Sequence, residues 1–598
     1  MIRHWLIFAV ALIALCGSVT TVFATQTWRD YELRGYVDPT QTTDLPYRLS
    51  QRLGVNADLF QYDDSELTRH LALMRNANIV WVRQFIYWND FEATQGVFEW
   101  DSLDRVMLAL EAYPEIQIIP VFINSPAWSR DNDVVTAPPD DPTAIVPFLQ
   151  AYAERYGEAV DYYQIWDEPN LDDAWGLRDP RPAEYAALLA EAYGAIHGTD
   201  SDAMVIAAAL APTTEERGQN IADDLYLQAL YDLEADIYFD AVAAKPYGFN
   251  SAPLSRDVGR DFLNFSRMVL LREVMVANGD GQAALWASHW GWNHLPEAWT
   301  GDASIWGSVS AEEQTRYVGQ ALDRVEREWA WAGGLLLHHW QPNVRLDDAQ
   351  WGFALIGQDG EPTALYDALV GYEWASAASN GVYHPRTEYA DYSGVWTFSA
   401  LGADIGWLET SDSQLAFDFY GTDVALWLRE DDYFAFLYPR VNGEMANATP
   451  EDADGNTYIL LRSGSQTPEL STVAVSRDLR LDAHTLTVVA DRGEDRWALA
   501  GYAVSSGDLG RPFAQQLTLA WLTVVCSVLA VIVSAVRLPF GDVYVQLEVW
   551  YSRIYTGVQV GISILTSLAL MVGMLMTWGM PTPQLFRREM LDAGMLIA

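Results

Sequence analysis

The chain has 598 residues and a formal net charge of -45, and half of its residues are apolar. This length exceeds what one hydrophobic core supports, so we expect two or more folded domains, and the apolar share excludes a disordered chain. The negative charge repels phosphate backbones and argues against a nucleic-acid-binding protein, leaving a solvated acidic surface as the simplest interpretation.

An apolar segment, residues 5–23, follows Arg3 and ends in the small-residue sequence VFA, which is typical of a signal peptide. The same segment would also suit an uncleaved anchor. We therefore expect residues 1–25 to be a signal peptide or a signal anchor, and both alternatives stay open at this point. Export would place the large middle portion of the chain on the extracytoplasmic side of the cell membrane.

Apolar runs that resemble buried parallel strands then alternate with helical patterns. The predicted strands are a first one near 53–59 and then 79–87, 116–124, 160–169, 204–213, 239–249, 283–292 and 333–342. The predicted helices include 65–77, 141–156, 182–197 and 311–329, the last with Ser310 as its N-cap. Eight strand–helix units predict a (β/α)8 barrel over residues 26–375. A doubly wound open sheet is the competing fold, but no glycine-rich phosphate turn follows the first strand.

The pattern changes to short alternating runs over residues 376–508, with turn residues between them and no helical periodicity of useful length. This predicts an all-β sandwich. Two uncharged apolar runs follow, 517–536 and 558–580, each long enough to span a bilayer. We expect transmembrane helices at 515–537 and 557–580, so the lipid bilayer is a predicted partner.

The two cysteines, Cys16 and Cys526, both lie in apolar segments. The sequence therefore predicts no disulfide framework, no cysteine metal site and no cofactor. It does not predict an oligomeric state.

Catalytic groups of such a barrel lie where its strands end. The fourth strand ends in IWDEPN, residues 165–170, which places Glu168 after a tryptophan and before a proline. A carboxyl group in a mostly apolar pocket suits a general acid, because burial disfavours its charged form. The alternative is a glutamate that only caps a loop.

Several motifs together resemble the clan A glycoside hydrolases of the family 5 and family 39 type. The segments that carry the resemblance are WVRQFIYWNDFEATQGVFEWDSLD (81–104), INSPAWS (123–129), IWDEPN, FDAVAAKPYG (239–248), WASHWGW (286–292) and GFALIGQDGEPTALYDAL (352–369). The resemblance implies a carbohydrate ligand and an O-glycosidic bond as the target, with Glu168 at the acid/base position.

Three positions depart from the pattern of that clan. His289 stands where the clan has its glutamate nucleophile, and residues 283–292 contain no aspartate or glutamate. Lys245, the only lysine of the chain, stands where the clan usually has histidine, two residues before Tyr247. Asp167 replaces the usual asparagine. Since a retaining glycosidase needs a second carboxylate about 5 Å from its acid, the usual nucleophile is missing.

We therefore predict Glu168, His289 and Lys245 as catalytic candidates. The predicted substrate-binding residues are Asp167, Arg83, Trp88, Trp128, Tyr247, Trp290, Trp292 and Trp340. We expect Lys245 at the barrel mouth with Asp167, Glu168 or both as counter-ions, either as a functional group or as a structural salt bridge. Each tryptophan is a candidate for stacking on a sugar ring or for core packing.

We predict an exported, membrane-tethered protein of the glycoside hydrolase type that acts on a polysaccharide or glycoconjugate, with a catalytically inactive glycan-binding surface protein as the alternative. Three functional interpretations remain open. The first is an active glycosidase with Glu168 as the acid. Its base would be a loop carboxylate (Glu297, Asp302, Asp347 or Asp348), or the substrate would supply its own nucleophile, or His289 would serve as the nucleophile or base. The second is a barrel that binds glycans without cleaving them. The third is a membrane-bound transferase or hydrolase that acts on anionic sugars, whose negative charge Lys245 and His289 would recognise. The sandwich resembles galactose-binding-like carbohydrate modules, on its final strands at 481–506, and such modules often bind glycans.

Overall fold

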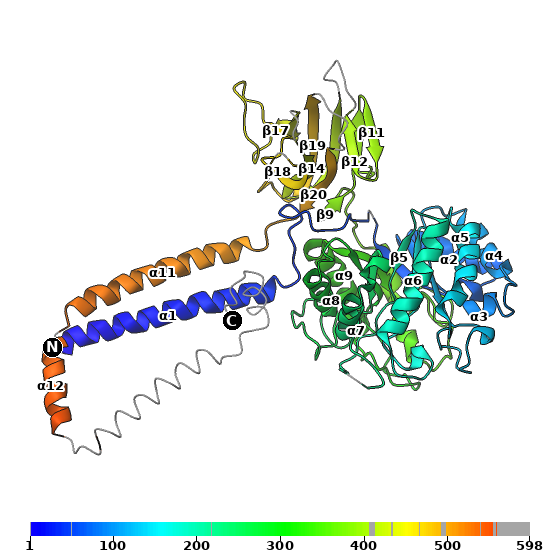
Figure 1. Ribbon diagram of the computed structural model, residues 1–598, viewed down its shortest axis with the longest axis horizontal. Helices are drawn as coiled ribbons and strands as arrows, with labels where there is room; N and C mark the ends of the chain where they lie inside the picture. The colour runs from blue at the N-terminus through cyan, green and yellow to red at the C-terminus, as the bar shows by residue number, and fades with distance from the viewer. Residues whose placement is uncertain are drawn as a thin grey trace. The chain divides into compact units, whose positions relative to one another are not determined.

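The protein forms two compact units in the computed structural model (Figure 1). One comprises residues 30–510, and the other comprises residues 1–29 together with the chain from 511 onward. The structure describes residues 2–538, 540–553 and 558, apart from Ser50, Arg217, 406–412, 432–434, Gln466 and 492–497.

Eight parallel strands close into a barrel, which confirms the predicted fold class. The strands are β1 (Leu53–Asn56), β2 (Trp81–Tyr87), β3 (Gln117–Ile123), β4 (Tyr162–Ile165), β5 (Met204–Ile206), β6 (Ala241–Ala244), β7 (Ala284–Trp290) and β8 (Ala332–Leu337). Closure comes from β1, which pairs with both β2 and β8. The competing open sheet is therefore wrong.

Helices cover the outside of this barrel (Figure 1). They are α2 (Asp64–Asn76), α3 (Trp88–Phe91), α4 (Asp101–Leu110), α5 (Val146–Tyr156), α6 (Pro182–Thr199), α7 (Asp223–Asp232), α8 (Arg267–Ala277), α9 (Ala311–Glu328) and α10 (Ala364–Val370). Ser310 caps α9 as predicted, and it forms a reciprocal capping box with Glu313. The apolar faces of these helices pack against the strands and form a continuous buried core with them.

The barrel interior is filled by side chains in layers. An apolar layer at the amino end includes Trp81, Trp286 and Leu336. Gly54 of β1 faces this layer, and a Cβ built there would lie 2.1 Å from Leu336 Cδ2 and 2.6 Å from Trp81 Cβ. Toward the carboxyl ends of the strands the interior becomes polar, beginning with Asn56 and Arg83.

Two six-stranded antiparallel sheets follow the barrel, as predicted for the sandwich. Their strands are β9 (Gly381–Tyr383), β10 (Ala390–Ser393), β11 (Trp396–Ser399), β12 (Gly402–Ile405), β13 (Gln414–Gly421), β14 (Asp423–Glu430), β15 (Phe436–Val441), β16 (Glu444–Met445), β17 (Ile459–Leu460), β18 (Glu469–Ser476), β19 (Asp482–Asp491) and β20 (Leu499–Ser505). One buried core joins both sheets, for example through Phe417 stacked on Tyr502 with ring centroids 4.0 Å apart.

The other unit contains the helices α1 (Ile2–Glu32), α11 (Arg511–Val536) and α12 (Phe540–Ser552). By length and composition, two described helices could cross a membrane, Arg3–Glu32 and Arg511–Val536. α1 continues beyond residue 25, where we expected a signal sequence to end. The second predicted C-terminal span, 557–580, lies outside the described residues except for Val558.

Replacing Gly54 with alanine should destabilise the barrel by about 1–3 kcal/mol, because the new methyl group overpacks the interior layer. Urea unfolding of the full chain in detergent, followed by tryptophan fluorescence, measures the loss. Gly319→Ala is the control, since a Cβ on that α9 residue meets nothing within 4 Å. The control should raise stability by roughly 0.5–1 kcal/mol through helix propensity. Equal midpoints for the two variants would contradict the prediction.

Candidate active site

Lys245 joins two carboxylates at the carboxyl ends of the barrel strands. Its Nζ lies 2.7 Å from Asp167 Oδ2 and 2.8 Å from Glu168 Oε1. The Lys245 side chain is 3% exposed, whereas Glu168 is 28% exposed and reaches solvent. The structure thus brings together the lone lysine and both of its expected counter-ions. Within the described part of the chain, Glu168 Oε2 has no hydrogen-bond partner and stays open as an acceptor.

Arg83, on β2, is the second cation of the site and is 1% exposed. It donates from Nη2 to Asp167 Oδ1 at 2.7 Å, from Nε to Gln164 Oε1 at 2.8 Å and from Nη1 to Asn56 Oδ1 at 2.9 Å. Burial lowers the pKa of this guanidinium, and the neighbouring Asp167 opposes that shift. Each nitrogen has an acceptor, so Arg83 is fully engaged.

Asp167 accepts from Arg83 on one oxygen and from Lys245 on the other. An asparagine here would turn its NH₂ group toward one of the two cations, which explains why a carboxylate suits this position. Counting formal charges, Arg83 and Lys245 balance Asp167 and Glu168. The four side chains form a closed, neutral network.

His289 lies inside the barrel because β7 is irregular. The pairing of β7 with β8 shifts register between Ala287 and Trp290, so the usual alternation of side chains breaks there. Trp286 faces the interior layer, Trp290 belongs to the outer core, and His289 Nε2 lies 3.4 Å from Arg83 Nη1. Burial, followed by the charges of Lys245 and Arg83, holds the pKa of His289 well below its usual value, so the ring is neutral.

A second buried histidine, His338, extends the site beyond the predicted residues. Its ring lies 5.1 Å from that of His289 and 5.2 Å from that of Tyr247, between centroids. Among the described residues, neither nitrogen of His338 has a hydrogen-bond partner, and His289 Nδ1 has none either. Burial lowers the pKa of His338 well below its usual value. Two neutral imidazoles therefore keep unused hydrogen-bonding atoms beside the ion-pair network.

The backbone around Glu168 is held in an unusual conformation. Trp166 and Glu168 both have positive φ angles, +67° and +52°. Such conformations cost on the order of 1–3 kcal/mol for residues other than glycine, and they concentrate at functional sites. Asn170 ties this turn to the loop after β5. Its side chain donates to the carbonyls of Ala211 and Ile221 and accepts from the amide of Ala211.

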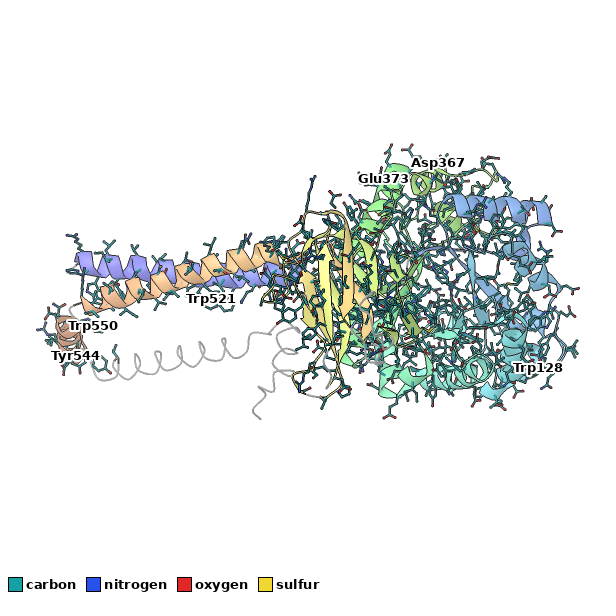
Figure 2. The ribbon with its side chains drawn as sticks, turned by 90° about the horizontal axis from the view of Figure 1, so that it is seen from above. Trp128, Asp367, Glu373, Trp521, Tyr544 and Trp550 are labelled. Carbon is teal, nitrogen blue, oxygen red and sulfur yellow. The ribbon has the colours of Figure 1, made fainter. Side chains whose placement is uncertain are left out.

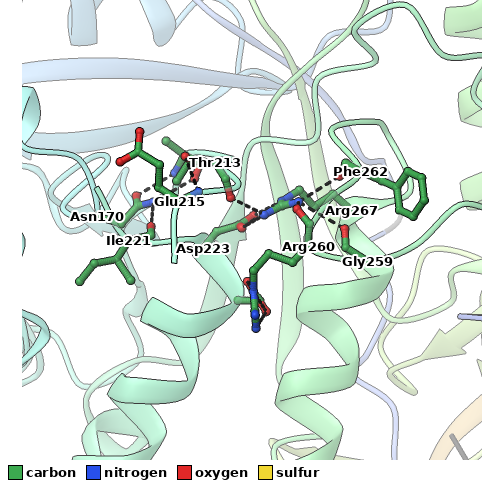
Figure 3. Close-up of polar contacts among 11 residues, drawn as sticks. Asn170, Thr213, Glu215, Ile221, Asp223, Gly259, Arg260, Phe262 and Arg267 are labelled. Carbon is green, nitrogen blue, oxygen red and sulfur yellow. Dashed lines mark hydrogen bonds and ion pairs between the residues drawn. The ribbon is translucent and has the colours of Figure 1, made fainter. Parts of the chain in front are cut away.

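A buried ion pair ties the following loops together (Figure 3). Arg267, 2% exposed, pairs with Asp223 and donates to the carbonyls of Thr213, Arg260 and Phe262. These contacts join the loop after β5 to the loop after β6, which carries Lys245. The sequence gives no motif for this pair, since both residues lie at helix starts far from the strand ends.

Four of the predicted sugar-stacking tryptophans lie in the core instead: Trp88, Trp290, Trp292 and Trp340, each at most 1% exposed. Trp88 donates to Glu92, and Trp340 donates to His70 on α2. Their faces are covered by other side chains and offer no surface to a sugar. Trp128 is half-buried and reaches the surface of the folded unit (Figure 2).

Two aromatic residues that the sequence analysis passed over line the interior above Arg83. Phe85 and Tyr87 follow Arg83 at alternate positions of β2 and are both partly exposed. Their rings stack with centroids 6.0 Å apart, and the Arg83 guanidinium lies 4.9 Å from the Phe85 ring centroid. Strand periodicity would have found them, because every second residue faces the same side as Arg83.

The loop carboxylates proposed as replacement bases bind elsewhere. Asp302 and Asp347 both pair with Arg345, and Asp348 accepts from the backbone of Gln350. Glu297 is exposed. Among the described residues, no group of three or more histidine, cysteine, aspartate or glutamate side chains could hold a metal ion.

No family model and no curated protein matches the chain. Similar solved structures include a family 39 glycoside hydrolase from Bacteroides cellulosilyticus WH2, with 17% identity, 76% of this chain and 82% of that chain covered, and a TM-score of 0.45. A GH39 enzyme from Xanthomonas axonopodis pv. citri has 16% identity, covers 75% and 96%, and gives a TM-score of 0.42. A GH5_18 protein from Streptomyces cattleya, in complex with GlcNAc, has 13% identity, covers 55% and 80%, and gives a TM-score of 0.42.

Acid should destabilise the folded unit partly through its buried histidines. The folded pKa values of His289 and His338 lie well below 6.5, so the unfolded chain binds more protons as the pH falls below about 6.5. Their contribution is complete above that pH and is lost as the pH falls toward the folded values. His338→Phe should flatten the fall in unfolding free energy between pH 7.5 and pH 5. An unchanged slope, or a steeper one, would contradict this.

Lys245→Met should cost about 3 kcal/mol of stability, the lower end of the range for a broken buried ion pair, because Glu168 is partly exposed. The urea midpoint at pH 7.5 measures the effect. Adding Glu168→Gln should recover part of the loss, since one unpaired carboxylate is removed. The control is Arg155→Met, which breaks an exposed pair with Asp104 and should shift the midpoint much less. Similar losses for both single variants would contradict a buried network.

Proposed function

We propose that the barrel binds neutral glycans at the carboxyl ends of its strands, as the exported and membrane-tethered part of a glycosidase-like protein. The observation that carries this proposal is the position of Lys245 Nζ between Asp167 and Glu168, at 2.7 and 2.8 Å. A site of glycosidase type is retained, but its charges are committed to one another. The motif resemblance to clan A glycoside hydrolases supplies the class of ligand.

Retaining hydrolysis needs one carboxyl group that carries a proton and a second, free carboxylate that attacks the sugar. Glu168 has one carboxylate oxygen engaged by the Lys245 ammonium group. Asp167 has both oxygens engaged by cations. His289, at the usual nucleophile position, is neutral and lies against Arg83. These contacts favour binding over double displacement.

Charge favours a neutral ligand over an anionic one. Arg83 and Lys245 are balanced by Asp167 and Glu168, so neither of these two cations is free to bind a uronic acid. The chain as a whole carries -45 and repels polyanions at long range. Sugar hydroxyls, which donate and accept, fit the open Glu168 Oε2 and the unpartnered histidine nitrogens, and the Phe85–Tyr87 pair offers an apolar ring face.

Hydrolysis with Glu168 as general acid/base is the second candidate. The positive φ of Glu168 and its 28% exposure favour it, because strain at a solvent-facing carboxylate is typical of catalytic positions. On this alternative, a bound substrate would draw Glu168 away from Lys245, and His289 would act as nucleophile or base.

The β-sandwich and the apolar helices complete the proposal. We assign the sandwich as a carbohydrate-binding-like module, on the resemblance of its last strands to such modules. α1 and α11 are long and apolar enough to tether the chain to a bilayer. The folded unit would then meet its glycan outside the cell.

The test is glycan binding and turnover by the full chain in detergent. Neutral and uronic-acid oligosaccharides are titrated calorimetrically, and reducing ends are assayed in parallel. We expect saturable binding of neutral glycans, no turnover, and at least tenfold weaker binding by Glu168→Gln, since one charge-assisted hydrogen bond contributes about 1.5–3 kcal/mol. The control is Glu373→Gln, an exposed carboxylate on the surface (Figure 2).

Each outcome decides between the candidates. Turnover that disappears in Glu168→Gln would replace the binding proposal with the hydrolytic one. Equal affinity for uronic-acid glycans would overturn the choice of a neutral ligand. Absence of both binding and turnover across the panel would overturn both candidates.

Tyr87→Ala should weaken binding of the same glycans by roughly tenfold, because stacking on an aromatic face contributes about 1 kcal/mol or more. Tyr87→Phe keeps the ring and should bind almost as well as the unchanged chain. Trp290→Phe is the matched comparison for a buried aromatic residue, and it should change stability without changing affinity. A larger effect on affinity at residue 290 than at residue 87 would refute the stacking assignment.

A further inference from the structure

We propose that α1 remains in the mature protein as a transmembrane helix, paired antiparallel with α11, and is not removed as a signal peptide. This inference does not rest on glycan binding. It starts from the part of the chain made of residues 1–29 and the helices after 511, which form one compact unit.

The two helices carry matching buried stripes. On α1, the least exposed residues recur every three or four positions: Ala11, Leu15, Ser18 and Val22. On α11 the same spacing gives Phe513, Leu517, Ala520, Val524, Ser527, Val531 and Ser534. A repeat of alternating three and four residues is the seam of two helices packed side by side.

The stripes alternate small and large residues. Ala11 and Ser18 are seven apart on α1, and Ala520, Ser527 and Ser534 are each seven apart on α11. Leucine or valine lies between them on both helices. In lipid, helices associate through close packing and not through the hydrophobic effect, so small residues at each turn of the seam are what permits close approach.

The stripes contact each other in the structure. Val22, Ala520 and Val524 form one buried cluster, with Leu15 and Leu517 packed against it. Figures 1 and 2 show α1 and α11 side by side over most of their lengths. Residues late in α1 and early in α11 share the cluster, as an antiparallel pair requires. The stripe is therefore an occupied interface.

The opposite faces of both helices are apolar and exposed. They include Leu6, Ile7, Val10 and Ile13 on α1, and Leu519, Leu522, Val525 and Leu529 on α11. The helices have 31 and 26 residues, or about 46 and 39 Å at 1.5 Å per residue, and either length spans a hydrocarbon core. Exposed apolar faces of this kind are stable in contact with lipid tails. The buried stripe of each helix is covered by the other helix.

Removal of the N-terminal segment after Ala24 would break this pair. The cut would fall inside α1, eight residues before its end at Glu32, and would detach Leu15 and Val22 from α11. The small residues of α11 would then face lipid without a partner. With α1 retained, the folded unit between Asp30 and Gly510 is held to the membrane by its two ends.

Two measurements on the full chain in native membranes test the pair. The first is the mass of the N-terminal peptide of the purified protein, which should contain residues before Ala24. The second is disulfide crosslinking in a Cys16→Ser/Cys526→Ser background. Ser18→Cys on α1 is combined with Ala520→Cys or with Val524→Cys on α11. Ala520 and Val524 are the two buried α11 residues that lie within one helical turn of Ser18 along the helix pair. Crosslinked monomer is expected for at least one of these combinations.

The matched control is Ile13→Cys with Leu529→Cys. In an antiparallel pair, residues at the same level have residue numbers with a constant sum, and this pair has the same sum as Ser18 and Val524. Ile13 and Leu529 lie on the exposed faces, however, with 71% and 56% of their surfaces exposed. It should form no crosslink within one chain. A mature protein that lacks residues 1–24 would overturn the proposal. The proposal would also be overturned if the crosslinking yield of the interface pairs did not exceed that of the control pair, even in a protein that keeps its N-terminal peptide.

Discussion

The polar interior of the barrel depends on one constraint: charges taken out of water must cancel among themselves. Arg83 and Lys245 are almost fully buried, and neither could stay there without an anion in contact. Asp167 supplies one carboxylate oxygen to each cation, and Glu168 supplies a further oxygen to Lys245. His289 and His338 lie beside this network and stay neutral, because burial disfavours a charged ring and the nearby cations repel a further positive charge.

The constraint also explains why the three departures from the clan A pattern occur together. A glutamate nucleophile at position 289 would add a negative charge beside Arg83. With histidine there, that charge is absent, while lysine at 245 adds a positive one and aspartate at 167 adds a negative one. The sum returns to zero only when Glu168 is charged as well. The three differences from that pattern therefore form one electrostatic solution, in which Glu168 serves as a counter-ion.

Sequence patterns predicted the barrel because each buried strand is a separate apolar run, and strand closure follows from their number. They also placed Lys245 near Asp167 and Glu168, since all three follow strand ends. The tryptophans were harder, because the direction of Trp290 depends on a β7 irregularity that no local pattern reveals. Trp340 turns toward His70 of α2 only through tertiary packing. His338 was missed because a histidine at the end of an apolar run, here followed by His339, gives no sign of which neighbours it will meet. Phe85 and Tyr87, in contrast, follow from the alternation that starts at Arg83.

A purely structural role for the ion-pair network does not account for everything in this site. A structural role explains Lys245 and Asp167, whose charges cancel. It does not explain His338, because an apolar residue there would fill the same volume without leaving two unpartnered nitrogens. A structural role also gives no reason for the positive φ angles of Trp166 and Glu168, since such backbone conformations lower the stability of the fold. Features that cost folding free energy persist where they serve a ligand. The strained Glu168, with one oxygen on Lys245 and the other open, meets that description better than a salt bridge retained for stability alone.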